Sequence, residues 1–574
     1  MKMGFIRLWL TVLLLQIVCP DMLTAKELFA NGHSDYAIVL TDKASLSEQT
    51  AAKELQTLLR TISGATLPIV THPTNKGIYI GWTKDTGNPR PAETDESFTY
   101  KTIGDNLYIF GGSERGTMYG VYRFLERELG VHWYTSSFTK IPKRKQFLLH
   151  TLYHHDSPVI RQRLDFYYDA LRHHDWAAHN LLNTQYQLAE TPYGRMSAIW
   201  GMHTFHTLMP PSSYFKEHPE YYSIYQGKRS DKAQLCLSNQ SMRIELTKNL
   251  LKTIASDPGY WCYDVSQNDN SWPCECTLCQ QLIKKYGGHS GAIIWFVNQV
   301  AREVEKVFPD IYIGTFAYKY TRQAPKSSIR PADNVVIRLC DIECCFAHSL
   351  ESCEQNSIFL RDMNDWRQIA KNIYIWDYTT GFRNYLLPFP NFDVLAANFR
   401  FFSSSNVIGI LEEGAHDAPW SEFSELKQWL IAKLMWNPNQ DTDSLATLFI
   451  NDYYGKAAPF VKQYYDLCRI QVTDNTHFTI KLDWHSNLYS DSFVTKSIKL
   501  IQKALASVKD NTEEHKRIQH VAAQLYYLKF RRNMAKSATD GTLQKLKTII
   551  ANDHTILAEF GLTLESLLKT HHYY

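Results

Sequence analysis

The sequence predicts an α/β protein built around a (β/α)8 TIM-type barrel, with an N-terminal α/β domain before the barrel and a C-terminal helical region after it. Three observations predict this fold class. Eight strand-like runs lie between Arg161 and Leu411, and most of them precede a plausible helix. The residues before this stretch alternate strands and helices on a smaller scale, and those after it are helical. A chain of 574 residues has room for several such domains.

Four segments are expected: a targeting segment at 1–25, the N-terminal α/β domain at 26–153, a catalytic barrel at 154–436 and the helical region at 437–574. Lys2 and Arg7 supply the positive start of the targeting segment, and Leu8–Val18 supplies its apolar run. That run is too short for a membrane span, and no later run is long and apolar enough to be one. We therefore expect an exported protein, which is periplasmic, at the cell surface or secreted. Cys19 would permit a lipid anchor, but Val18 precedes it where such signals usually place a small residue.

The N-terminal domain is predicted from three strands and two amphipathic helices. The strands are Tyr36–Leu40, Gly77–Gly81 and Asn106–Phe110, and the helices are Ser47–Leu59 and Thr117–Leu129. Gly111, Gly112 and Gly116 lie in the turn between the last strand and the second helix, where a phosphate could bind. Their spacing fits neither the dinucleotide fingerprint nor the P-loop, so we interpret them as packing residues.

The strands of the predicted barrel determine which residues line its working face. We expect strands at Arg161–Phe166, Ser197–Trp200, Gln234–Leu237, Trp261–Ser266, Ile311–Phe316, Asn334–Leu339, Ile373–Asp377 and Val407–Leu411. Active sites of such barrels lie at the C-terminal strand ends. The residues at these ends are Asp165, His203, Asn239, Asn268, Asp269, Tyr318, Asp341, Asp377, Tyr378, Glu412 and Glu413. Asp and Asn favour strand ends in any fold, but so many acids at one face indicate a site.

The last part of the chain is predicted to pack as helices on the barrel. The helices expected there are Ser444–Tyr454, Phe460–Val472, Asp491–Val508, Thr512–Ala538 and Leu543–Ala558. They are amphipathic and carry no concentrated group of polar residues.

Composition excludes some partners and favours others. The 61 Lys and Arg residues nearly balance the 58 Asp and Glu residues, and they form no long basic run, so nucleic acid is not an expected partner. Aromatic residues make up 13% of the chain. Such an excess fits clefts in which flat rings receive the C–H faces of sugars, although large cores use aromatic residues too.

Apart from Cys19, the chain has ten cysteines, and nine of them lie between Cys236 and Cys353. In an oxidising compartment an even number permits disulfides. The alternative is a thiolate metal site formed by Cys262, Cys274, Cys276 and Cys279, but C-x-C-x-x-C is not a standard zinc spacing. We therefore favour structural cysteines, unpaired or in disulfides, and expect no metal and no cofactor.

Several motifs resemble known glycoside hydrolases. Gly112–Tyr122 looks like part of the N-terminal α/β domain that precedes the barrel in family 67 α-glucuronidases and family 20 hexosaminidases. Five further stretches together resemble glycoside hydrolase family 163: His218–Tyr222, Gln234–Asn239, Ser266–Asn270, Cys344–His348 and Trp376–Tyr378. The resemblance covers roughly residues 30–470. It implies an endo-β-N-acetylglucosaminidase that acts on complex N-glycans, either as oligosaccharides or on glycoproteins.

The resemblance implies a retaining reaction in which the acetamide of the substrate is the nucleophile. One protein acid then protonates the leaving oxygen, and a second polar group holds the acetamide. Related barrels keep this pair after the fourth strand, which here means Asn268 and Asp269. Asp269 would be the acid, its pKa raised by burial, and Asn268 would orient the acetamide. The relatives carry Asp and Glu there, so Glu412 or Glu413 is the alternative acid, with Asp269 then serving the acetamide.

The other candidates for binding the substrate are His203, Tyr318, Trp376, Asp377, Tyr378 and, for an acidic sugar, Arg163 on the first strand. Each of them also has a purely structural interpretation, such as core packing or an ion pair in the barrel. Two alternative functions stay open. One is an α-glucuronidase-like hydrolase with two protein carboxylates, and the other is a carbohydrate-binding protein without catalysis.

Overall fold

The computed structural model describes residues 26–552 apart from 88, 189–190 and 418–420, so the expected targeting segment and Cys19 lie outside the described residues. The chain forms two compact units. One consists of Met1–Val131 and Ile141–Asp156, and the other of His132–Lys140 and Ser157–Tyr574. Among the described helices, none combines the length and the apolar composition of a membrane span.

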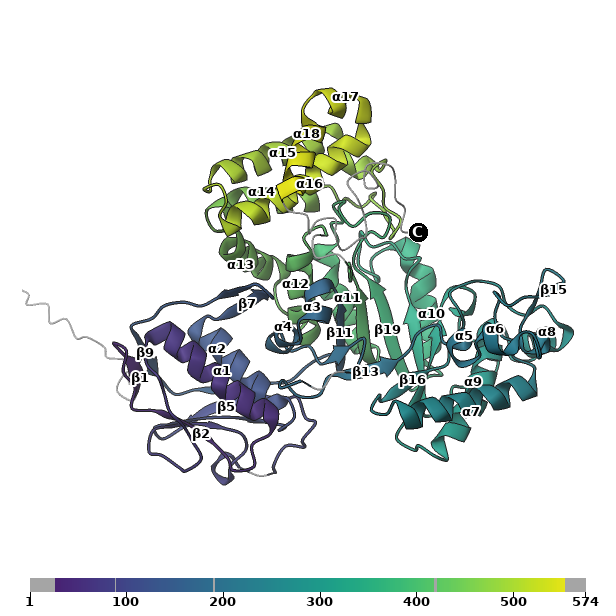
Figure 1. The fold of residues 1–574 in the computed structure, drawn as a ribbon, viewed down its shortest axis with the longest axis horizontal. Coiled ribbons are helices and arrows are strands. Elements are labelled where there is room, and N and C mark those ends of the chain that lie inside the picture. Colours follow the sequence, from purple (N-terminus) through teal and green to yellow (C-terminus); the bar gives the residue numbers. More distant parts are fainter. Residues whose placement is uncertain (1–25, 88, 189–190, 418–420, 553–574) are drawn as a thin grey trace, which may run out of the picture. The chain divides into compact units, whose positions relative to one another are not determined.

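The first unit is a mixed sheet with two helices (Figure 1). Its strands are β1 (Lys26–Ala30), β2 (Ala37–Leu40), β3 (Ile69–Val70), β4 (Gly77–Ile80), β5 (Phe98–Ile103), β6 (Asn106–Gly111), β9 (Gln146–Leu149) and β10 (Tyr153–Asp156), and its helices are α1 (Leu46–Ser63) and α2 (Gly116–Leu129). The six-stranded sheet has the order β10-β5-β6-β4-β2-β3, and β1 pairs with β9. The predicted strands and helices of this region are confirmed.

Local sequence explains both helices of this unit. Ser45 and Glu48 form a capping box at the start of α1, and apolar residues at helical spacing bury one face of the helix. At the start of α2, a Cβ atom on Gly112 would lie 2.2 Å from the backbone oxygen of Asp95, and one on Gly116 would lie 2.4 Å from it. These glycines are therefore required for close packing of the backbone, as the sequence predicted.

The second unit contains the barrel. Its strands are β7 (His132–Thr135), β8 (Phe138–Lys140), β11 (Gln162–Phe166), β12 (Thr184–Gln185), β13 (Ser197–Trp200), β14 (Ile224–Tyr225), β15 (Lys228–Arg229), β16 (Cys262–Asp264), β17 (Tyr312–Ala317), β18 (Val335–Cys340), β19 (Asn372–Tyr378) and β20 (Val407–Glu413). Its first helices are α3 (Tyr168–Arg172), α4 (His174–His179), α5 (Phe205–Leu208), α6 (Pro211–Tyr214), α7 (Gln240–Ser256), α8 (Thr277–Lys285), α9 (His289–Glu305), α10 (Ser357–Arg367), α11 (Phe392–Ser404) and α12 (Ser424–Trp436).

Eight parallel strands form a nearly closed barrel in the order β11-β20-β19-β18-β17-β16-β13-β12. Side chains complete the ring between β11 and β12. The Asn183 side chain accepts a hydrogen bond from the Arg163 backbone at 2.9 Å and donates one to the Arg161 carbonyl at 2.8 Å. The predicted TIM-type fold class is confirmed.

One expected barrel strand is wrong, and one barrel strand was not expected. Gln234–Leu237 is not a barrel strand but part of the long excursion between β13 and β16, where Leu235 forms only an isolated bridge with Tyr222. Asn239, expected at the end of that strand, instead caps the N-terminus of α7. The true second strand is β12, which has only two residues and therefore shows no alternation in the sequence. One strand too many and one strand too few were counted before β16, so β16 is still the fourth strand of the barrel.

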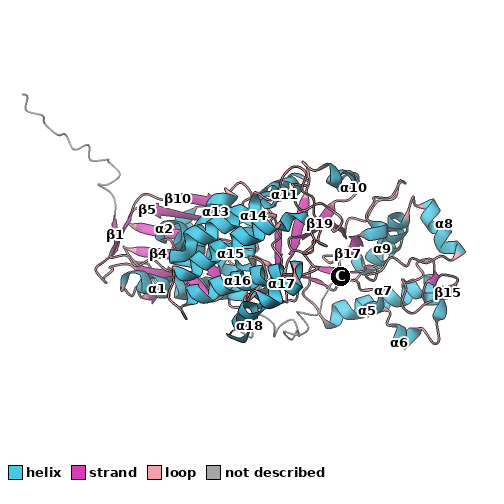
Figure 2. Cartoon of the chain, turned by 90° about the horizontal axis from the view of Figure 1, so that it is seen from above, coloured by secondary structure: helices cyan, strands magenta, loops and turns pink. Residues whose placement is uncertain are grey.

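The C-terminal helices are α13 (Thr442–Tyr454), α14 (Ala458–Arg469), α15 (Asp491–Ala506), α16 (Glu513–Arg532), α17 (Met534–Thr539) and α18 (Thr542–Asn552). Figure 2 shows α13 to α16 as neighbouring helices, in agreement with their contacts. The single helix expected over Thr512–Ala538 is two helices. Asn533 leaves the helical conformation, with φ at −151°, and its side chain accepts a hydrogen bond from the Lys536 backbone to start α17.

Candidate active site

Two adjoining cavities lie at the C-terminal ends of the barrel strands. The smaller holds about 130 Å³ and is lined by Met202, His203, Asp269, Phe316, Tyr318, Cys340, Ile342, Trp376, Tyr378 and Glu413. The larger holds about 600 Å³, and its lining includes Arg172, His174, Tyr186 and His416. Met202, Trp376 and Glu413 line both cavities, so these three residues mark their junction.

Strand register explains which side chains face the cavities. Tyr378 of β19 pairs with Glu413 of β20, and Trp376 pairs with Leu411 two residues earlier. Paired residues of parallel strands point to the same face of the sheet, and successive residues alternate. Trp376, Tyr378 and Glu413 therefore face the barrel interior, while Asp377 and Glu412 face the opposite side.

Glu413 is a buried acid. Its Oε2 accepts a hydrogen bond of 2.6 Å from the indole N–H of Trp376. Burial, helped by the negative charge of Asp269 and opposed by the Trp376 bond, raises the pKa of Glu413 to about 7. Near neutral pH this carboxyl is therefore available as a proton donor.

Asp269 is in the opposite state. It follows β16, and one carboxylate oxygen accepts hydrogen bonds from Lys319 Nζ at 2.8 Å and from the Tyr318 hydroxyl at 3.2 Å. Partial burial alone would raise the pKa of Asp269, but the bond and charge of Lys319, aided by His203 and Tyr318, outweigh burial and lower it. The expectation that burial raises this pKa was wrong because it took no account of Lys319.

Two strained residues and a buried ion pair shape the smaller cavity. His203 and Lys319 have φ values of 53° and 50°, a left-handed conformation that costs energy outside glycine. His203 Nδ1 lies 2.8 Å from the Gln267 carbonyl oxygen, which fixes the ring beside Asp269. Beneath the aromatic wall, Arg338 pairs with Asp264 at 3.2 Å and lies 5.0 Å from the Trp376 ring. These contacts hold the cavity in shape before any substrate binds.

Asn268 does not line either cavity. Its amide nitrogen donates to the Ala233 carbonyl at 3.1 Å, and its amide oxygen accepts from the His206 backbone at 3.2 Å. Because both ends of the amide hold backbone groups, Asn268 is a brace of its loop. This placement corrects the expectation that it orients the substrate.

Glu412 and Asp377 belong to a separate group that we call the outer carboxyl cluster, formed by Asp165, Asp341, Asp377 and Glu412. All four are buried on the face of the barrel wall opposite the cavities. Burial raises the pKa of each, to about 6 for Asp377. Neither Asp377 nor Glu412 can reach a substrate in the cavities, so both expected roles are corrected.

Arg163 also lies away from the cavities. It is fully buried, its Nε donates to the Leu181 carbonyl at 2.9 Å, and its guanidinium lies 5.2 Å from the Trp436 ring. Arg163 therefore stabilises the start of the barrel and does not bind an acidic sugar.

The expected residues His203, Asp269, Tyr318, Trp376, Tyr378 and Glu413 come together in the smaller cavity. Sequence analysis missed Lys319, Met202, Phe316 and Arg338. Lys319 could have been found, because it follows directly on Tyr318 at the end of the fifth strand. Phe316 and Arg338 lie inside strands, where their inward direction depends on register.

A family model described as a domain of unknown function (DUF4838) matches residues 133–466, which is more than half of the chain. Among curated proteins, none gives a significant match.

Solved structures with a similar fold include glycoside hydrolases. A family GH115 4-O-methyl-α-glucuronidase, BtGH115A, with specificity for decorated arabinogalactans, has a TM-score of 0.58 at 11% identity, covering 91% of this chain and 77% of that one. CpGH84D has a TM-score of 0.48 at 10% identity, covering 92% and 91%. The Flavobacterium johnsoniae chitobiase FjGH20 has 0.46 at 12%, covering 95% and 96%. At these identities the likeness concerns the fold.

Proposed function

The chain belongs to the family described as a domain of unknown function (DUF4838), and on the chemistry of its site we propose that it is a glycoside hydrolase. Glu413 is the general acid in this proposal and Asp269 its ionised partner. The glycoside hydrolases among the structures of similar fold are consistent with the proposal.

One observation carries the proposal: two carboxyl groups of one cavity have pKa values displaced in opposite directions. Cleavage of a glycosidic bond needs a protonated acid for the leaving oxygen and a negative group for the positive charge that develops on the sugar. Two carboxyls whose environments separate their pKa values meet both needs at the same pH. Burial provides the acid at Glu413, and Lys319 maintains the charge at Asp269.

The position of Glu413 agrees with the role of an acid. A general acid must reach the oxygen between the two sugars, so it must lie between the subsites on either side of the bond. Glu413 and its partner Trp376 lie at the junction of the two cavities. A substrate that spans both would place its scissile bond beside the Glu413 carboxyl.

The finer proposal is a retaining, substrate-assisted endo-β-N-acetylglucosaminidase that acts on complex N-glycans. The smaller cavity supports it, because its aromatic walls next to an ionised carboxylate suit an acetamido group, with an apolar methyl and a polar N–H. Asp269 then holds the acetamide as it attacks the anomeric carbon, which is the role that the sequence left open between Asn268 and Asp269. The larger cavity offers room for further sugars. The resemblance to family 163 supports the same substrate.

One observation favours a second candidate, an α-glucuronidase-like enzyme with two protein carboxylates. Arg172 and His174 line the larger cavity and could pair with the carboxylate of a uronic acid. Activity on glucuronosides without release of N-glycans would replace the first proposal by this one.

The test compares wild-type protein with Glu413→Gln and Asp269→Asn on a serum glycoprotein carrying complex N-glycans. We expect the wild type to release glycans, and both variants to lose most of that activity. An aryl glycoside with an acidic phenol needs little protonation to leave, so it should restore turnover to Glu413→Gln and not to Asp269→Asn. If glycans bind without being cleaved, the chain is a binding protein. If both variants cleave normally, the site is elsewhere.

A further inference from the structure

Two groups of cysteine and histidine side chains lie outside the cavities described above. The first consists of Cys236, Cys274, Cys276 and Cys279, and the second of Cys345, His348, Cys353 and His477. In each group four ligand atoms, one from each residue, all lie within 4.8 Å of one another. The ten cysteines of the described chain form no disulfide.

The distances within the four-cysteine group fit a tetrahedral metal site. Sulfur ligands placed about 2.3 Å from a zinc ion at the corners of a tetrahedron lie about 3.8 Å apart. Cys236 Sγ lies 3.7 Å from Cys276 Sγ and 3.8 Å from Cys279 Sγ. A disulfide would need about 2.05 Å. The group therefore has the spacing of metal ligands.

The surroundings of these sulfurs suit thiolates. Cys276 is the N-cap of α8, and its Sγ accepts a hydrogen bond of 3.4 Å from the Cys279 backbone. The Ser238 hydroxyl lies 3.4 Å from Cys236 Sγ and 3.6 Å from Cys276 Sγ, and it can donate to either sulfur. Hydrogen-bond donors of this kind orient the side chains that bind a metal ion and offset the negative charge of their thiolates.

This group differs from the metal site considered from the sequence, because Cys236 takes the place of Cys262. Cys262 lies inside β16 and is fully buried, beside Asp264 and Gly314 of the barrel. Cys236 comes from the excursion between β13 and β16, 38 residues before Cys274 in the numbering. The three cysteines of the C-x-C-x-x-C motif thus obtain their fourth partner from a part of the chain that is distant in sequence.

The second group has the spacing of a site with two cysteines and two histidines. A tetrahedron with Zn–S near 2.3 Å and Zn–N near 2.05 Å separates sulfur from nitrogen by about 3.6 Å. His477 Nδ1 lies 3.4 Å from Cys345 Sγ and 3.7 Å from Cys353 Sγ, and His348 Nδ1 lies 3.9 Å from Cys345 Sγ. The other ring nitrogen of His348 lies 3.0 Å from the Thr473 carbonyl, an arrangement that directs Nδ1 toward the sulfurs.

From these two groups we propose that the chain binds two zinc ions, one through Cys236, Cys274, Cys276 and Cys279 and one through Cys345, His348, Cys353 and His477. Both ligand sets are those of zinc, and each supplies four protein ligands. With no position left for water or substrate, both sites are structural. Neither takes part in the proposed hydrolysis.

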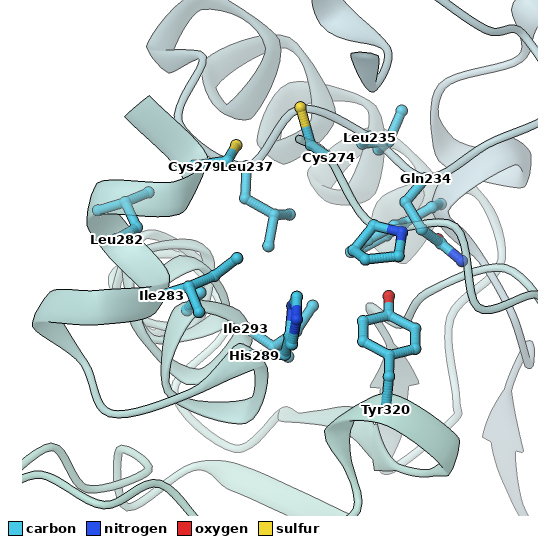
Figure 3. Close-up of a pocket in the computed structure, with 13 residues that line it drawn as sticks. Gln234, Leu235, Leu237, Cys274, Cys279, Leu282, Ile283, His289, Ile293 and Tyr320 are labelled. Atoms are coloured by element: carbon cyan, nitrogen blue, oxygen red, sulfur yellow. The ribbon is translucent and has the colours of Figure 1, made fainter. Parts of the chain in front are cut away.

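The first site braces the loop that carries Asp269. Cys274 follows Asp269 by five residues, and Gln234, close to Cys236, donates to the Asn268 and Asn270 carbonyls at 2.9 and 3.0 Å. On its other side, Cys274 and Cys279 lie at the edge of a small apolar pocket against α8 and α9, where Figure 3 shows them with Leu282 and Ile293. This pocket holds only about 20 Å³, too little for a sugar.

The second site joins the loop after β18 to the segment after α14. Cys345 and Cys353 follow the cavity residues Cys340 and Ile342, whereas His477 comes from the C-terminal part of the chain. The Phe346 backbone also donates to the Phe478 carbonyl at 2.9 Å. A metal here would fasten one wall of the smaller cavity to the helical region.

The experiment measures zinc per chain in full-length protein produced with added zinc and purified without chelators. We expect two zinc ions for the wild type. The double variant Cys276→Ser/Cys279→Ser should keep only the zinc ion of the second group, and Cys345→Ser/His477→Ala should keep only that of the four-cysteine group. Each double variant is therefore the control for the other. Cys468→Ser removes a buried cysteine of α14 that belongs to neither group, and it should keep both ions.

A second measurement serves if a double variant fails to fold. A mercurial that binds thiolates should release both zinc ions from the wild-type chain, and replacement by cobalt should give the absorption of tetrahedral thiolate-bound Co²⁺. Zinc near zero per chain, with intact mass showing two hydrogens lost for every pair of cysteines, would establish disulfides and overturn the proposal. Bound iron in place of zinc, or zinc that the paired variants leave unchanged, would overturn it as well.

Discussion

Glu412 and Glu413 are neighbours on β20, yet they belong to different parts of the molecule. Glu413 faces the cavities, bonds Trp376 and has Asp269 as a charged neighbour. Glu412 is completely buried on the opposite face, where the described residues offer neither of its carboxyl oxygens a hydrogen bond. Burial raises the pKa of both. A raised pKa therefore does not by itself identify a catalytic acid; access to the cavity and an ionised partner must accompany it.

The strongest way to test this comparison is to change the two glutamates separately. Glu413→Gln keeps the size of the side chain and removes its proton, so we expect kcat/KM to fall by about 10²–10⁴-fold. Glu412→Gln should leave kcat/KM near the wild-type value, since its side chain does not reach the cavity. Steady-state rates of glycan release from a glycoprotein decide the matter. A large loss in Glu412→Gln with an active Glu413→Gln would reverse the two roles.

Asp269→Asn tests whether the carboxyl groups of Asp269 and Glu413 act as a pair. Loss of the charge that stabilises the transition state should reduce kcat by on the order of 10²-fold. The negative charge of Asp269 also raises the pKa of Glu413, so its removal should lower that pKa. Because the acid works only when protonated, activity in the wild type is lost as pH rises through about 7.

In Asp269→Asn this alkaline limb should lie at lower pH. A pH profile of kcat/KM for the residual activity measures the shift. An unmoved alkaline limb would show that the two carboxyls do not interact.

Lys319→Met should have a smaller effect on the same pair. Lys319 lowers the pKa of Asp269 through a hydrogen bond and its charge, so its loss should raise that pKa. The acid limb of kcat/KM should therefore move to higher pH, with a loss of less than about tenfold near neutral pH for a shift of one unit or less. Lys371→Met is the matched control, since Lys371 forms an exposed ion pair with Asp333 at 2.6 Å. If both variants behave alike, Lys319 does not control Asp269.

The sequence was sufficient to predict the barrel, because its last four strands, β17 to β20, are runs of six or seven mostly apolar residues, and helices follow most of the strands. It was insufficient where a strand is two residues long, as in β12, or where an apolar run such as Gln234–Leu237 belongs to an excursion. Periodicity cannot distinguish such a run from a buried strand.

The sequence also predicted only part of the candidate site. Placing residues at strand ends identified His203, Asp269, Tyr318, Tyr378 and Glu413, all of which line one cavity. It could not separate Glu413 from Glu412, because a shift of one residue reverses the face, and the register is set by tertiary pairing. It also could not show that Lys319 reaches Asp269 from another strand, or that Cys236 joins the later cysteines. Each of these contacts joins residues that are distant in sequence.

The outer carboxyl cluster should make the stability of the folded chain depend on pH. This is the smallest of the expected effects. Burial raises the pKa of Asp377 from 3.8 to about 6, so between these values the folded chain binds more protons than the unfolded chain. Stability then falls as pH rises through this window, by on the order of 1–3 kcal/mol.

Asp377→Asn carries no charge at any pH, and its side-chain oxygen can still accept the bond from the Tyr378 backbone. Relative to wild type, its thermal midpoint should be higher at pH 8 and little changed at pH 4.5, with activity retained. Asp333→Asn, at an exposed position, should show no such pH dependence. An equal change at both pH values would mean that Asp377 is not held protonated, and the contrast between the two faces of the barrel wall would then rest on access to the cavity alone.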